Sequence, residues 1–115
     1  MLFVHDHVFA ECEGSLYTTG TLNQGLLDRY KGWFGSLSVL ARHKNVGPDN
    51  QSVKPESRVE GDFTLVEKSG NPLDYLGHRK TVREAVGKAD CVVSRMPSVL
   101  GWMAVDECRR QGVPY

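Results

Sequence analysis

The chain has 115 residues, a length that suits one domain with one modest hydrophobic core. Its 14 Lys and Arg residues balance its 14 Asp and Glu residues, so the charge gives no reason to expect a nucleic acid or an anionic membrane as partner. No apolar stretch approaches the roughly 20 residues of a membrane-spanning helix, and the apolar run at residues 2–4 is too short for a secretion signal. We therefore expect a cytoplasmic protein without a transmembrane segment. Peripheral attachment at the inner face of the membrane is an alternative that these patterns leave open.

The first predicted element is a short buried strand over Leu2–His5, where an apolar run meets polar residues. A loop over Ala10–Gly20 follows, and it contains small hydroxyl residues together with Gly14 and Gly20. Glycines allow the backbone to come close to a ligand, so this loop is a candidate for forming a site.

Helical spacing of apolar residues predicts a helix over Leu22–Phe34. Thr21 and Gln24 form a capping-box pattern at its start, and Gly35 suits its end. We expect its aromatic residues to belong to the core, namely Tyr30, Trp33 and Phe34.

A second buried strand is predicted over Leu37–Ala41, with Arg42 at its exit. The residues from His43 to Glu60 are polar and contain Gly47, Pro48 and Pro55, which favours an exposed, mobile connection. A third strand follows over Phe63–Glu67.

Asn71 and Pro72 resemble an N-cap and a first helical position, and they begin a predicted helix over Pro72–Lys88. Asp90–Val93 is the fourth predicted strand. Ser98 can cap a third helix, which Gly112 ends.

The alternation of strands and helices predicts an α/β fold: a Rossmann-like, open, mostly parallel sheet with helices on both faces. We expect residues 1–115 to form a single domain. The chain stops just after the third helix, where the alternation calls for another strand, so we expect this domain to be incomplete. In such sheets, ligands bind beyond the carboxyl ends of the strands. The candidates for a ligand site are therefore residues 5–20, Arg42 and residues 94–98.

The sequence His5-Asp6-His7 suggests a metal site, because alternate residues of a strand share a face and would bring both imidazoles together. No third ligand occurs at a useful spacing. We therefore expect no metal, and we favour a role for these side chains at the exit of the strand.

Two features of the sequence suggest a binding site for an anion. The loop with Gly14 and Gly20 leads to a helix N-terminus, where free N–H groups favour phosphate, although it matches neither the Walker pattern nor the GxGxxG pattern. An ordinary connecting loop is the alternative. Arg95 follows the fourth strand, so its guanidinium group should project into the cleft and hold a phosphate or a carboxylate; a salt bridge to a neighbouring acid is the alternative there.

The three cysteines are odd in number and lack CxxC spacing, which argues against a disulfide framework and a zinc knuckle. We expect reduced thiols at Cys12, Cys91 and Cys108, and we expect the last two to pack as small hydrophobic groups.

Three stretches together resemble the N-terminal domain of bacterial family 4 glycosyltransferases, notably those of capsule and exopolysaccharide assembly. They are LFVHDHVF, LYTTGTLNQGLLDRYKGWFGSLSVLAR and DCVVSRMPSVLGWMAVDECRRQGVPY, and they cover most of the chain. The resemblance implies a GT-B fold of two Rossmann-like domains. In that fold the N-terminal domain mainly receives a glycan or lipid-linked acceptor, and the C-terminal domain binds a nucleotide sugar. It also implies retention of the anomeric configuration, with no divalent metal and no cofactor.

Carried onto this chain, the resemblance assigns Thr19 and Gly20 to the glycine loop near the donor diphosphate. It assigns Asp6 and Arg95 to the cleft as catalytic candidates, although many family members have a histidine at the position of Arg95. The acceptor side of the cleft comprises His5, His7, Arg42, Ser94 and Ser98.

The family's acidic E-x7-E element and its donor-binding domain lie downstream of the part that this chain resembles. We therefore expect the chain alone to be inactive and to need a downstream polypeptide or a dimer, because positioning both reactants supplies much of the rate enhancement. Two other classes remain open: a non-catalytic remnant or interaction module that associates through a sheet edge, and a small nucleotide-binding protein of flavodoxin-like type.

Overall fold

Four parallel strands form the centre of the fold: β1 (Leu2–Cys12), β3 (Ser38–Asn45), β5 (Asp62–Glu67) and β6 (Val92–Ser94). The computed structural model describes residues 1–20, 22–68 and 72–115. Their spatial order is β5-β3-β1-β6, which is third, second, first and fourth along the chain. This is the order of the first half of a doubly wound sheet, and its direction reverses between β1 and β6. The predicted parallel α/β sheet is confirmed.

Two short strands make the sheet mixed. β2 (Ser15–Tyr17) pairs antiparallel with the end of β1, and β4 (Arg58–Val59) pairs antiparallel with β2. The prediction of a loop over Ala10–Gly20 is therefore wrong for most of its length. Glu13 and Gly14 have positive φ angles of 52° and 79°, which suit the tight turn of a hairpin.

The predicted polar connection over residues 43–60 is also wrong at both ends. β3 continues to Asn45, and a 3-10 helix (η1, Pro55–Ser57) precedes β4. The side chain of Val59 is buried in the core, which explains why this end of the segment is ordered against the sheet.

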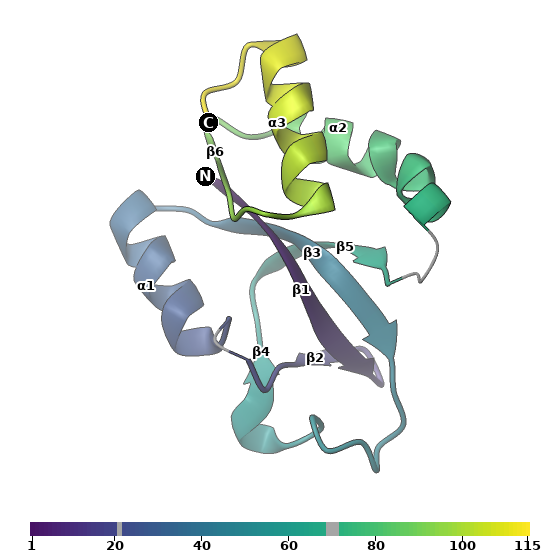
Figure 1. Ribbon diagram of the computed structural model, residues 1–115. Helices are drawn as coiled ribbons and strands as arrows, with labels where there is room; N and C mark the ends of the chain where they lie inside the picture. Colours follow the sequence, from purple (N-terminus) through teal and green to yellow (C-terminus); the bar gives the residue numbers. More distant parts are fainter. Residues whose placement is uncertain (21, 69–71) are drawn as a thin grey trace.

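Helices cover both faces of the sheet, as predicted (Figure 1). α1 (Gln24–Phe34) lies on one face, whereas α2 (Arg79–Gly87) and α3 (Val99–Gln111) lie on the other. Alternate residues of β1 serve the two cores: Leu2 and Val4 pack with α2 and α3, while Phe3 and Phe9 pack on the α1 side. Among the described residues, no helix is long and apolar enough to cross a membrane.

The N-cap of α1 is Asn23, whose Oδ1 accepts a hydrogen bond from the Leu26 N–H group at 3.0 Å. Thr21, one half of the predicted capping box, lies outside the described residues. The side chain of Gln24, the other half, is bonded to Asp28 and to the Glu60 N–H group.

The prediction of an aromatic core stripe on α1 is wrong for two residues. Trp33 is 67% exposed and Phe34 is 49% exposed, while Tyr30 packs edge-on against Phe3. Helical spacing identifies a face of the helix, but it does not show how far along the helix the sheet extends.

The helix predicted over residues 72–88 is divided. Residues Pro72–His78 form a 3-10 helix (η2), and the α-helix begins at Arg79. Asn71, the predicted cap, lies outside the described residues. The third helix agrees with the prediction: the Ser98 hydroxyl caps α3, and Gly112 ends it in the left-handed conformation.

Candidate functional site

The candidate site lies where β1 separates from β6. β6 pairs with Leu2–Val4, and the Arg95 N–H group adds a last bond to the Val4 carbonyl oxygen at 3.0 Å. β2 pairs with the same strand only from Ala10 onward. Within the described part of the chain, residues 5–9 of β1 therefore have no strand beside them on this side. This position is the switch point at which open α/β sheets bind ligands.

β1 is irregular at this point. Val4 lies opposite Leu40 and Val8 lies opposite Arg42, so four steps along β1 match two steps along β3. β1 thus carries two extra residues, and an even number leaves the alternation of faces unchanged on either side. The prediction that the strand ends at His5 is wrong.

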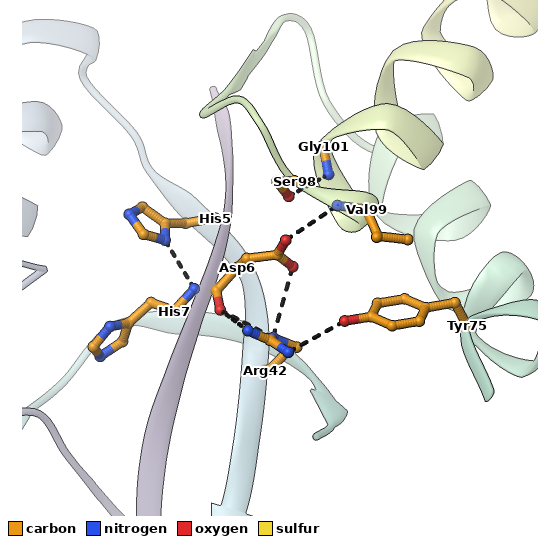
Figure 2. A network of polar contacts seen from close by, with 8 residues as sticks. All are labelled: His5, Asp6, His7, Arg42, Tyr75, Ser98, Val99 and Gly101. Atoms are coloured by element: carbon orange, nitrogen blue, oxygen red, sulfur yellow. Dashed lines mark hydrogen bonds and ion pairs between the residues drawn. The ribbon is translucent and has the colours of Figure 1, made fainter. Parts of the chain in front are cut away.

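Arg42 holds this irregularity in place. Its Nε and Nη2 atoms donate to the backbone carbonyl oxygen of Asp6 at 2.9 and 2.6 Å, and its Nη1 donates to the Tyr75 hydroxyl at 3.2 Å (Figure 2). Arg42 was predicted at a strand exit, but it lies inside β3 because β3 continues to Asn45. Its guanidinium group is committed to these two partners.

The Asp6 carboxylate points toward the start of α3 (Figure 2). Its Oδ2 accepts from the Val99 N–H group at 3.1 Å, and its Oδ1 lies 3.6 Å from Arg42 Nε. The buried Ser98 Oγ accepts from the Gly101 N–H group at 2.8 Å. Asp6 and Ser98 therefore both cap α3, where a negative charge also suits the helix dipole.

The imidazoles of His5 and His7 lie on the opposite side of β1 from the Asp6 carboxylate (Figure 2). They continue a series of edge-on ring contacts from Phe3 to Phe9. His5 Nδ1 accepts from the His7 backbone N–H group at 2.8 Å.

His7 also contacts the segment that follows β2. Its Nε2 lies 2.7 Å from Thr18 Oγ1, which itself accepts from the Gly20 N–H group at 3.1 Å. A Cβ atom at Gly20 would lie 2.9 Å from His7 Cε1, so a glycine permits this close approach. Of the predicted loop residues, Gly20 thus borders the histidine side of the site, and its N–H group is bonded to Thr18 within the same segment. Thr19 lies between these two residues, and no contact joins it to the histidines in the part of the chain that the structure describes.

Both histidines favour the neutral state. Burial, followed by the charge of Arg95, lowers the pKa of His5 from 6.5 to about 4. Burial and the charge of Arg42 lower the pKa of His7. At neutral pH each ring therefore offers one N–H donor and one nitrogen acceptor.

Arg95 and Ser94 lie at the exit of β6, as predicted. The exposed Arg95 side chain brings Nη1 within 3.0 Å of His5 Nε2. Ser94 Oγ is buried and has no hydrogen-bond partner among the described residues. The turn that follows contains a cis peptide bond between Met96 and Pro97.

Sequence reasoning missed two contributors, Thr18 and Tyr75. Thr18 lies two residues before Gly20 in a stretch rich in small hydroxyl residues, so its position was a usable signal. Tyr75 contacts Arg42 across 33 residues, and no local pattern indicates such a pairing.

The described residues contain no group of three or more His, Cys, Asp or Glu side chains placed to hold a metal ion. The cysteines there are free thiols, with Cys12 and Cys108 buried and Cys91 partly buried. What the site offers is a set of N–H donors and hydroxyl groups around an open strand edge, which suits hydrogen bonding to a polar ligand.

The chain is similar to protein CapJ of Staphylococcus aureus, with 30% identity over 120 residues. The match covers 100% of this chain and 30% of CapJ, so the chain spans less than a third of that relative. No protein-family model matches the chain, and no solved structure matches it significantly.

The contact between Arg42 and Asp6 gives a first prediction. Arg42→Lys should lower the free energy of unfolding by about 1–3 kcal/mol, because an ammonium group cannot replace both N–H bonds to one carbonyl and the bond to Tyr75. Urea unfolding measures this change. Arg29→Lys, on the exposed surface of α1, is the matched control and should change it by less than about 0.5 kcal/mol. Equal effects of the two substitutions would contradict the role given to Arg42.

The pKa of His5 gives a second prediction. Between pH 6.5 and about 4 the unfolded chain binds a proton at His5 that the folded chain does not bind, so this residue makes stability fall as the pH falls. His5→Asn removes the titration and keeps an acceptor for the His7 N–H group. In urea unfolding across this range, the variant should lose less stability than the wild type on acidification. Parallel pH profiles for the two proteins would show that His5 titrates normally.

Proposed function

We propose that this chain forms the acceptor side of a glycosyltransferase that acts in capsule polysaccharide assembly. The observation that carries the proposal is the meeting of His5, His7 and Arg95 at the switch point of a parallel sheet. Sugar hydroxyl groups both donate and accept hydrogen bonds, so neutral imidazoles and a guanidinium group are suitable partners for them.

The similarity to CapJ supports the same interpretation. It extends over the whole of this chain and is compatible with a role in capsule biosynthesis. Because the chain corresponds to only 30% of CapJ, we place the nucleotide-sugar site on polypeptide equivalent to the rest of that protein.

The residues divide by role in this proposal. His5, His7 and Arg95 hold the acceptor, and Thr19–Gly20 borders the donor phosphates because Gly20 packs against His7. Asp6 and Arg42 are positioning residues, since their polar groups bind each other and the start of α3.

One observation favours a second candidate, a non-catalytic interaction module. Trp33 and Phe34 lie exposed on α1, and Leu76 and Trp102 lie exposed on the other side of the sheet. Large exposed apolar side chains that occur together mark protein contacts.

A chimaera tests the proposal. In the chimaera, this chain replaces the matching part of CapJ. The assay measures transfer of labelled sugar from nucleotide sugars to capsule glycan. Intact CapJ and the isolated chain are measured in parallel. The chimaera should transfer sugar and the isolated chain should not, because it lacks the donor site. Arg95→Gln should lower transfer at least about tenfold through misplacement of the acceptor, and Arg29→Gln should leave it unchanged.

Transfer by the isolated chain would show that the donor site lies within it. An inactive chimaera beside an active CapJ, with the chimaera folded, would overturn the enzyme assignment and favour the interaction module.

A further inference from the structure

The ring of His5 meets more donors than it can accept. The His7 backbone N–H group lies 2.8 Å from Nδ1, and Arg95 Nη1 lies 3.0 Å from Nε2. A neutral imidazole has only one nitrogen lone pair, and its other nitrogen carries a proton. Two N–H donors therefore face the ring, and in either tautomer only one of them meets a nitrogen that can accept.

The contact that is more shielded from solvent decides which donor is in excess. The contact with the His7 backbone is partly buried and places the lone pair on Nδ1, so Nε2 carries the proton. Nε2–H and the Arg95 guanidinium group are then two donors side by side, at a contact that is exposed to solvent. Adjacent donors at this distance are suited to a single oxygen atom or to the two oxygens of an anion.

The charge on this side of β1 is also unbalanced. Asp6 follows His5 in the sequence, but its carboxylate lies on the other side, beside Arg42 and the Val99 N–H group. His5 and His7 are neutral at pH 7 because their pKa values are lowered. The positive charge of Arg95 therefore has no acidic partner among the described contacts on its own side.

A ligand can reach this position. β6 is a short strand at the edge of the parallel part of the sheet, and two residues near Arg95, Val93 of β6 and Met96, are 42% and 41% exposed. Arg95 itself is exposed, so an anion can approach it without any rearrangement of the core.

We infer that His5 Nε2–H and the Arg95 guanidinium group form a binding subsite for an oxyanion. Its chemical class is a carboxylate or a phosphate attached to a sugar. That the sugar belongs to a glycan acceptor rests on the proposed function, whereas the subsite itself rests on the donor geometry.

The test is a titration of the full chain at neutral pH, followed by nuclear magnetic resonance of the histidine rings. Three probes are used: glucuronate, glucose 1-phosphate and uncharged glucose. A charged probe should shift the His5 ring signals in a saturable manner and raise the pKa of His5, because a bound anion offsets the charge of Arg95. Glucose should have no such effect. Arg95→Gln should weaken binding at least about tenfold by removing the charged donor, and Arg29→Gln should not.

Shifts with glucuronate alone would assign the subsite to an acidic sugar, and shifts with glucose 1-phosphate alone would assign it to a phosphate. Shifts with neither, or shifts that persist unchanged in Arg95→Gln, would overturn the inference. Anion binding that persists when the CapJ chimaera transfers no sugar would sink the proposed function and leave the subsite intact. Sugar transfer by the chimaera without anion binding would overturn the subsite and leave the proposed function intact.

Discussion

The arrangement of the site depends on the bond from the Arg42 guanidinium group to the carbonyl oxygen of Asp6. β1 contains two extra residues at this point, and their backbone groups cannot all pair with β3. The guanidinium group donates to the Asp6 carbonyl oxygen, and β1 stays continuous on both sides of the irregularity. Because the alternation of faces is preserved, the histidines stay on one side of β1, and the Asp6 carboxylate reaches α3 on the other.

The two sides of β1 have different energetic roles. On the side of α3, hydrogen bonds join Arg42 to Tyr75 and Asp6 to the start of α3, so the effect of this network is to fix geometry. Asp6 Oδ1 has no hydrogen-bond partner among the described residues and lies 3.6 Å from Arg42 Nε. On the histidine side the donors exceed the acceptors, and Arg95 is exposed. A site that binds a polar ligand needs this combination of a rigid support and an unsatisfied surface.

The sequence predicted the parts of the fold that local patterns control. Short apolar runs identified the four parallel strands, and the residue types of Ser98 and Gly112 identified the limits of α3. The length of β1 could not be predicted in this way, because His5-Asp6-His7 looks like a strand end and is held in the sheet by a residue 36 positions away. His5, Asp6 and Arg95 were predicted together from the rule on strand ends. Their different roles depend on which face of β1 each side chain occupies. The sequence does not show this, because it does not reveal the irregularity in β1.

We propose above all that the ligand site is the open edge of β1 beside β6. Backbone amide chemical shifts of the full chain, recorded during titration with capsule oligosaccharides, test this claim most directly. We expect the shifts to concentrate at His5, His7, Gly20 and Arg95, with little change elsewhere. Shifts that concentrate instead in the apolar cavity between η2 and α3, around Leu76 and Met103, would contradict it.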